Sequence, residues 1–193
     1  IFLAAALQTP TPADVEYQNA VAVGQQTVKL QHSLPLVNQV VLVPDEATYL
    51  DELSKWSPDA RWPILFDDNR LAPMFIRRFR PQKVWRRSPV GKPVKDFETT
   101  SQHVIAKAWG GTASVDVSFA ENGLIPTGLV ITNKDDPARV GAVALAAGRG
   151  QLLRFVEKWG EEDVLWSVAE TLQRMQKVQA LVQETNDNIV TIT

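Results

Sequence analysis

The stretch "VVLVPDEATYLDELSKWSPDARWPILF", residues 40–66, carries the pattern of a strand, a helix and a second strand. Its two ends, "VVLV" and "PILF", are short continuous apolar runs, which are typical of parallel strands buried on both faces. Asp45 follows the first run at the position of a helix N-cap, and an apolar residue then recurs at every third position. These apolar residues are Ala47, Leu50, Leu53 and Trp56. The stretch therefore predicts one βαβ unit.

A second unit of the same kind follows in the other half of the chain. "GLVIT" and "QLLRFV" are predicted strands, and "DDPARVGAVALAA" is the predicted helix between them. The interval from Leu129 to Leu152 is 23 residues, and so is the interval from Val40 to Pro63. Tandem βαβ units with right-handed crossovers are most simply joined in one open sheet.

We therefore predict an α/β fold, a Rossmann-like three-layer domain with a mostly parallel sheet and two tandem βαβ units. One continuous sheet should bury Val41, Leu65, Val130, Leu153 and Val190 in neighbouring strands. A helix that buries Leu71, Phe75 and Phe79 should precede a strand at "KVWR". The remaining predicted elements are a helix at 96–109, a half-exposed strand at 114–119, a long helix at 161–183 and a last strand at 188–193.

The composition favours one globular domain. The 193 residues are 45% hydrophobic, enough for one sizeable core, and the chain has no cysteine, which excludes disulfides and thiolate metal sites. We expect an N-terminal arm at 1–36 and a single domain at 37–193, made of two similar halves, 37–111 and 112–193. "IFLAAAL" at the start fits the end of a signal peptide or an apolar arm docked on the domain. No segment approaches the roughly 20 apolar residues of a membrane helix.

A basic segment stands out in a chain of net charge −2. Residues 70–95 contain nine cations and no acid: Arg70, Arg77, Arg78, Arg80, Lys83, Arg86, Arg87, Lys92 and Lys95. Arginine predominates, which suits a bidentate grip on carboxylate or phosphate. We expect one exposed face for an anionic polymer or an acidic protein surface, centred on Arg77, Arg78, Arg86 and Arg87, with Arg80 and Lys92 beside them. The alternative is a solvated face that is paired with acids elsewhere in the chain.

Acidic residues follow the predicted strands, at the sheet edge where open α/β folds bind ligands. They are Asp45, Glu46, Asp67, Asp68, Asp135 and Asp136. Converging carboxylates would suit a metal-assisted hydrolase or transferase, whereas an Asp before a helix is also the ordinary N-cap. The chain has no G-x-G-x-x-G, P-loop or G-x-S-x-G motif, and His32 and His103 lack metal-ligand spacing. We therefore assign no catalytic residue, no metal and no cofactor, and expect no bound dinucleotide.

Two segments resemble the cell-wall-binding repeat type 2 family. They are "PDEATYLDELSKWSPDARWPILFDDNRLAPMFIRRFRPQKVWR" and "DFETTSQHVIAKAWGG", within about residues 40–110, with a fainter echo after 128. The family's D-x-L, P-I-L and x-P-x-x-V motifs correspond to Asp51 and Leu53, to 63–65, and to Pro81 and Val84. Its Arg-Tyr helix start reads Asp-Phe at 96–97, and "RRSPVG" stands where a glycine-rich segment is expected.

The resemblance implies a non-catalytic Rossmann-like module that attaches exported proteins to anionic envelope polymers. The leading hypothesis is thus a binding domain in the cell envelope or outside the cell, the other location being the cytoplasm. The alternatives are an enzyme acting at the strand-end acids and a structural docking domain of a larger envelope protein. Nucleic acid is not an expected partner, because the chain is acidic overall and the basic segment lacks interleaved exposed aromatic residues.

Overall fold

Parallel strands form the first of two sheets in the computed structural model. The structure describes residues 21, 36–112, 114–121, 126, 128–157, 182–184 and 190–192. The first sheet has the order β2-β1-β3, with β1 at Gln39–Val43, β2 at Ile64–Phe66 and β3 at Lys83–Arg86. All pairs are parallel, and Val41 of the central strand lies opposite Ile64 on one side and Trp85 on the other.

The second sheet has the order β5-β4-β7-β6. Its strands β4 (Leu129–Asn133) and β5 (Leu152–Val156) are parallel, and β7 (Val190–Ile192) and β6 (Val182–Glu184) add antiparallel pairs. The α/β class and both βαβ units are therefore confirmed. The prediction of one continuous sheet is wrong, because no described strand pairs across the two sheets.

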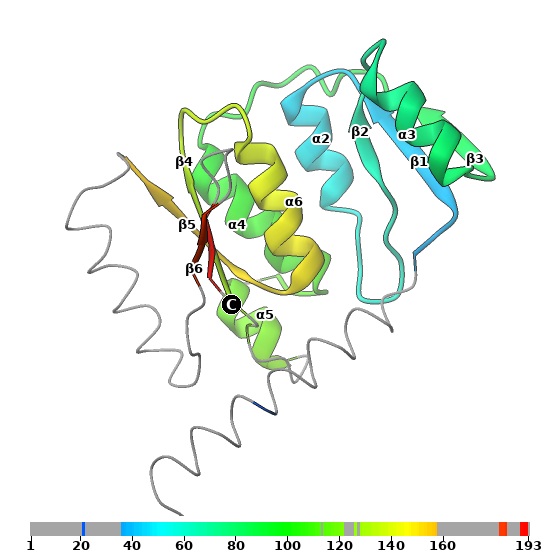
Figure 1. The fold of residues 1–193 in the computed structure, drawn as a ribbon. Coiled ribbons are helices and arrows are strands. Elements are labelled where there is room, and N and C mark those ends of the chain that lie inside the picture. Colours follow the sequence, from blue (N-terminus) through cyan, green and yellow to red (C-terminus); the bar gives the residue numbers. More distant parts are fainter. Residues whose placement is uncertain are drawn as a thin grey trace, which may run out of the picture.

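Helices fill the space between the sheets, as Figure 1 shows. These are α2 (Glu46–Leu53), α4 (Phe97–Ala108) and α6 (Arg139–Arg149), whose buried side chains form one cluster with residues of both sheets. Val41 and Val43 enter this cluster from the first sheet, and Val130 and Leu153 enter it from the second. The two βαβ units therefore meet through their helices, which explains why their strands do not need to share one sheet.

The opposite face of the first sheet is covered by α3 (Leu71–Phe79) alone among the described helices. Val40 and Leu42 point to this face, where they contact Ala72, Ile76 and Phe79. The predicted burial of Leu71 and Phe75 is therefore wrong, since the helix turns its small Ala72 to the sheet, whereas Phe79 packs there as predicted. Ala72 is fully buried, whereas Leu71 is 65% exposed.

Two other predicted elements differ from the structure or lie outside it. Of residues 114–119, predicted as a strand, all but the first belong to the helix α5 (Val115–Glu121), in which Val115 and Phe119 are buried together one helical turn apart. The arm at 1–36, with His32, and the helix at 161–183 lie almost entirely outside the described residues, but Val182–Glu184 form β6. In the described part of the chain, no helix has the length and apolar character needed to cross a membrane.

Candidate functional site

Seven cations of the basic segment are exposed and form no ion pair with another described residue, and five of them lie on or beside α3 and β3. Arg70 precedes α3, Arg77 and Arg78 lie in its last turn, Arg80 ends it in the left-handed conformation, and Lys83 begins β3. None of these side chains forms an ion pair with another described residue. Arg77 and Arg78 also stand at the helix C-terminus, where the macrodipole favours positive charge.

Apolar side chains lie beside these arginines on the outer side of α3. Leu71, Met74 and Phe75 are 65%, 54% and 38% exposed. Their spacing of three and four residues continues to Arg78, so the four side chains follow one another along one flank of the helix. Phe75 also stacks on Phe79, with ring centroids 5.4 Å apart, which holds the exposed ring in place. The helix thus offers a surface that is both apolar and cationic.

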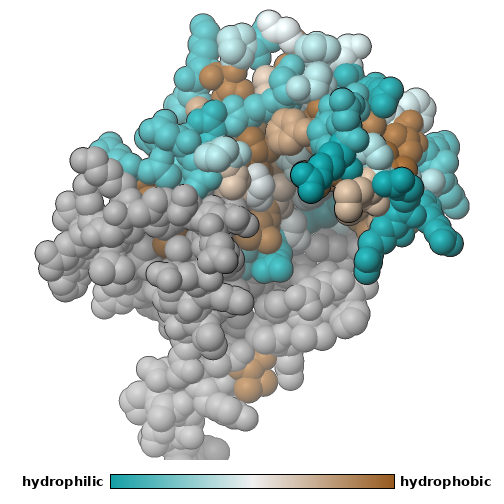
Figure 2. All heavy atoms as spheres, turned by 45° about the horizontal axis from the view of Figure 1, so that its top comes forward, coloured by the Kyte–Doolittle hydropathy of each residue, from teal (hydrophilic) through white to brown (hydrophobic). Residues whose placement is uncertain are grey.

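The neighbouring strand β3 is an exposed edge. All four of its residues are exposed, Val84 by 45% and Trp85 by 53%, and β1 is its only neighbour among the described strands. Figure 2 shows hydrophobic side chains among hydrophilic ones on the side of the molecule where α3 and β3 lie. We define the α3–β3 surface as the exposed side chains, other than Pro73, of these two elements and of the residues that flank α3: Arg70, Leu71, Met74, Phe75, Arg77, Arg78, Arg80, Lys83, Val84, Trp85 and Arg86.

The acids after the strands of the first sheet serve the turns in which they stand. Asp45 caps α2, accepting a hydrogen bond of 2.7 Å from the Thr48 amide, and its pKa is lowered by hydrogen bonds from the Thr48 side chain and amide. Asp68 accepts from the amides of Leu71, Arg70 and Ala72, and these bonds lower its pKa as well. The capping alternative therefore describes Asp45, while Asp68 binds the first amides of α3 from two residues before its N-cap, Arg70.

The acids of the second sheet are likewise engaged locally. Asp136 follows β4, is buried, and accepts a hydrogen bond of 2.7 Å from the Ala138 amide, while its other oxygen has no hydrogen-bond partner among the described residues. Asp135 is exposed, and its amide donates to the Asn133 side chain. Among the residues that the structure describes, no three acids or histidines gather into a metal-binding group. The strand-end acids therefore do not form the converging cluster that metal-assisted chemistry requires.

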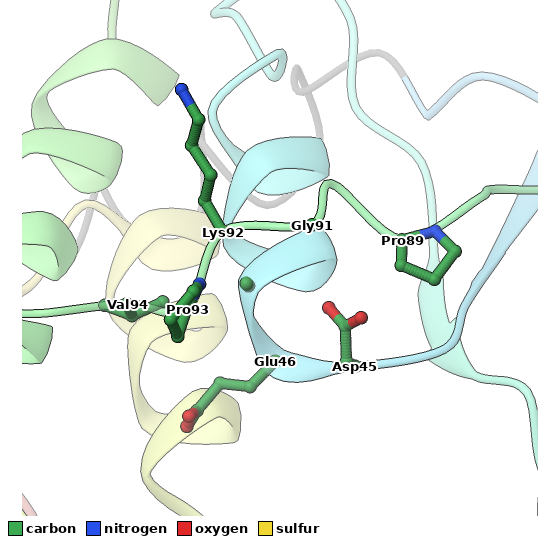
Figure 3. Close-up of a pocket in the computed structure, with 8 residues that line it drawn as sticks. Asp45, Glu46, Pro89, Gly91, Lys92, Pro93 and Val94 are labelled. Carbon is green, nitrogen blue, oxygen red and sulfur yellow. The ribbon is translucent and has the colours of Figure 1, made fainter.

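A cavity of about 410 Å³ lies between the start of α2 and the loop after β3. Figure 3 shows its lining residues, among which Lys92 directs its amine away from Asp45 and Glu46. Glu46 is occupied by Arg139, which donates to its two carboxylate oxygens over 2.7 and 2.8 Å. Lys92, which we predicted as a binding residue, thus lies at this cavity and not on the α3–β3 surface.

The last two predicted arginines point to opposite faces of the first sheet. Successive side chains of a strand alternate between its faces. Arg86 turns to the α3 face, where its Nε lies 3.2 Å from Oδ2 of Asp67. Arg87 turns to the α2 face and binds Asp51 over 3.0 Å. The predicted convergence of Arg77, Arg78, Arg86 and Arg87 on one face is therefore wrong.

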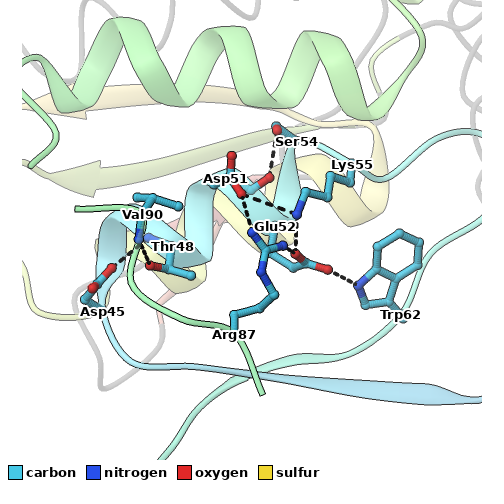
Figure 4. A network of polar contacts seen from close by, with 9 residues as sticks. All are labelled: Asp45, Thr48, Asp51, Glu52, Ser54, Lys55, Trp62, Arg87 and Val90. Carbon is cyan, nitrogen blue, oxygen red and sulfur yellow. Dashed lines mark hydrogen bonds and ion pairs between the residues drawn. The ribbon is translucent and has the colours of Figure 1, made fainter. Parts of the chain in front are cut away.

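Arg87 belongs to a network that fixes β3 to α2 (Figure 4). Besides Asp51 it binds Glu52, a buried carboxylate that also accepts from Lys55 over 2.7 Å and from the Trp62 indole over 3.1 Å. The charges of these four ionised side chains balance one another. The alternative of internal pairing, which we raised for the whole basic segment, therefore holds for Arg87 and, through Asp67, for Arg86.

Comparison of the chain with protein-family models, with curated proteins and with solved structures finds no match. The resemblance to cell-wall-binding repeats therefore stays a prediction. What sequence reasoning missed is the exposed apolar flank of α3. The sequence contains two apolar helix faces, one formed by Leu71, Met74 and Phe75 and the other by Ala72, Ile76 and Phe79. Spacing alone does not show which of the two faces is buried, because that depends on how the helix packs on the sheet.

Proposed function

We propose that the chain is a non-catalytic docking module whose α3–β3 surface binds an acidic protein. The observation that carries this proposal is the flank of α3 on which the exposed Leu71, Met74 and Phe75 lead to Arg78, which forms no ion pair with another described residue. Protein interfaces are enriched in aromatic residues, methionine and arginine, and exposed apolar patches rimmed by polar groups mark sites of interaction.

The apolar side chains favour a protein over an anionic polysaccharide. A polyanion held by charge alone would leave Leu71 and Met74 in water, whereas an acidic protein segment with apolar residues of its own would cover them. Burying such side chains contributes about 1.5–3 kcal/mol each. The envelope polysaccharide and the location in the cell envelope remain the competing proposal, and the experiment below includes it.

The strand-end acids support a non-catalytic role. Asp45 caps α2, Asp68 accepts hydrogen bonds from the first amides of α3, Asp67 pairs with Arg86, and Glu46 pairs with Arg139. The hydrogen bonds that Asp45 and Asp68 accept lower the pKa of both carboxyls, which makes these two residues poor general acids. The alternative of a hydrolase or transferase at these acids has no such support.

The proposal is tested with three synthetic probes: a peptide of alternating glutamate and valine, polyglutamate, and the acidic polysaccharide polygalacturonate. We expect the peptide to bind most tightly, and its binding to weaken as salt rises, because the arginines are solvent-exposed. Arg77→Gln with Arg78→Gln should weaken peptide binding severalfold. The control is Lys107→Gln with Arg154→Gln, which removes two exposed cations elsewhere.

Two results would overturn this function. One is binding of polygalacturonate in preference to the peptide, which would return the polysaccharide to first place. The other is the absence of binding by any probe at low ionic strength, or equal loss in the control variant, which would make the α3–β3 surface a solvated face.

A further inference from the structure

We propose that the acidic partner adds an extended segment to the open edge of β3 as a new strand of the first sheet, an inference that rests on the proposed function. The edge is open because β3 pairs with β1 alone among the described strands. Addition of a strand to an exposed sheet edge is a recurring mode of peptide recognition, in which backbone hydrogen bonds supply affinity and side-chain contacts supply specificity.

The direction of the backbone groups of β3 follows from one hydrogen bond at its end. The Arg87 amide donates to the Leu42 carbonyl of β1 over 2.9 Å, so Arg87 directs its amide inward. Because the direction alternates along a strand, Trp85 also faces β1, whereas Val84 and Arg86 direct their N–H and C=O groups outward. These two residues therefore present the donors and acceptors that an incoming strand would use.

The side chains of the edge indicate what kind of strand fits. Val84 and Arg86 lie on the α3 face, and Lys83 and Trp85 lie on the α2 face, in register with Gln39 and Val41. Each face of the edge therefore offers one apolar and one cationic side chain. An incoming strand that carries apolar and acidic residues would match both faces, since cross-strand neighbours interact in pairs.

A hollow of about 390 Å³ beside Trp85 gives room for such a strand. It is lined by Gln39, Val41, Trp85 and the Arg87–Glu52 pair, on the α2 face of the sheet. A side chain of the incoming strand that points to this face would enter the hollow and cover the exposed indole. The hollow and the outward amides are independent features of one edge, and both favour an added strand.

Charge at the edge would select the partner. Lysine and arginine on an edge strand ordinarily prevent pairing with other strands. Lys83, which forms no ion pair with another described residue, would repel a basic strand and attract an acidic one, whereas the charge of Arg86 is already paired with Asp67. The edge is thus protected against general aggregation while it remains open to an acidic segment.

A proline at position 84 tests the backbone contact. Val84→Pro removes an outward N–H that β1 does not use, and proline is tolerated at the solvent side of edge strands. Val84→Ala is the matched control, because it trims the same side chain and keeps the amide. Both variants are first compared with wild type by circular dichroism and thermal unfolding, and then titrated with the alternating glutamate–valine peptide and with a peptide of identical composition in a helical pattern.

We expect the alternating peptide to bind more tightly than the helical one, and Val84→Pro to weaken its binding about five- to tenfold, as for the loss of one hydrogen bond. Val84→Ala should change binding less than Val84→Pro. If Val84→Pro unfolds the sheet, N-methylation of alternate residues in the peptide removes the same contacts from the other side. Strand addition is overturned if both peptides bind equally, or if neither proline nor N-methylation weakens binding. The proposed function then still stands if Arg77→Gln with Arg78→Gln reduces binding, and it falls if no peptide binds.

Discussion

The guanidinium of Arg61 lies over the ring of Trp109, with its Cζ 4.1 Å from the ring centroid. The same group donates hydrogen bonds to the carbonyls of Ala147, Gly148 and Ala108, which belong to the last turns of α6 and α4. Burial lowers the pKa of Arg61 to about 10, so the group stays charged at neutral pH. One side chain therefore ties the segment before β2 to the C-terminal ends of two helices, where positive charge is favourable.

Replacing Arg61 by lysine should destabilise the protein strongly. Lysine keeps the charge but lacks the planar fork that reaches three carbonyls and stacks on an indole. We expect the free energy of unfolding in urea to fall by about 2–4 kcal/mol, because buried carbonyls lose their donors. The exposed Arg154→Lys should change it by less than about 0.5 kcal/mol. An Arg61→Lys variant as stable as wild type would show that this arginine does not join the helices.

The Arg87–Glu52 pair should contribute to stability, unlike Arg77. Arg87→Gln leaves the buried Glu52 carboxylate without one of its charged donors, and we expect a loss of about 1–2 kcal/mol. Arg77→Gln removes an exposed cation with no acidic partner among the described residues, so only its interaction with the helix macrodipole is lost, and the unfolding free energy should fall by less than about 0.5 kcal/mol. A double-mutant cycle of Arg87→Gln and Glu52→Gln measures the coupling. A coupling energy near zero would contradict the role of Arg87 as the link between β3 and α2.

Replacement by alanine should have opposite effects on stability at two glycines, Gly111 and Gly141. A Cβ on Gly111 would lie 1.7 Å from Oγ and 3.1 Å from Cα of Ser118, so α5 would have to move. We expect Gly111→Ala to cost about 1–3 kcal/mol. A Cβ on Gly141, inside α6, would meet nothing within 4 Å. Gly141→Ala should therefore stabilise the protein by about 0.5–1 kcal/mol, as measured by thermal unfolding. Equal effects at both positions would contradict the close contact between Gly111 and α5.

The N-cap Asp45 should make the stability of the protein depend on pH in the acidic range. Hydrogen bonds from Thr48 lower the pKa of Asp45 below its ordinary value of 3.8. A carboxyl with a depressed folded pKa stabilises the protein fully above its unfolded pKa, and this contribution is lost as pH falls through the folded pKa. We expect the unfolding free energy to fall below about pH 4, and Asp45→Asn, which keeps a capping oxygen without titrating, to flatten this dependence. An unchanged pH profile in Asp45→Asn would exclude Asp45 as a source of the acid sensitivity.

Local signals in the sequence predicted the βαβ units because each signal has one physical meaning. The apolar runs at Val40 and Leu129 have the length that is typical of buried strands, and an Asp before a helical stripe is ordinarily an N-cap. The arrangement of the units could not be predicted in the same way. Apolar helix faces satisfy either one sheet or two sheets joined through α2, α4 and α6, and the choice depends on contacts far apart in the chain.

The sequence predicted those features of the candidate site that depend on local patterns, but not those that depend on strand pairing. The exposure of Arg77 and Arg78 follows from the amphipathic pattern of α3, and it was expected. Which face Arg87 would take depends on the register of β3 with β1, since a shift of one residue reverses every side chain of a strand. Whether β3 lies at the edge of its sheet depends on the order of the strands, and local sequence patterns do not predict that order.

The most direct measurement of the central claim is the map of backbone amide shifts in the isotope-labelled protein as the alternating glutamate–valine peptide is added. The account predicts that the shifts gather on α3 and β3, with the largest at Val84 and Arg86, while the amides around Asp45 and Asp136 stay in place. Shifts that gather instead at the turns after β1 and β4 would contradict it and would move the binding site to the strand-end acids.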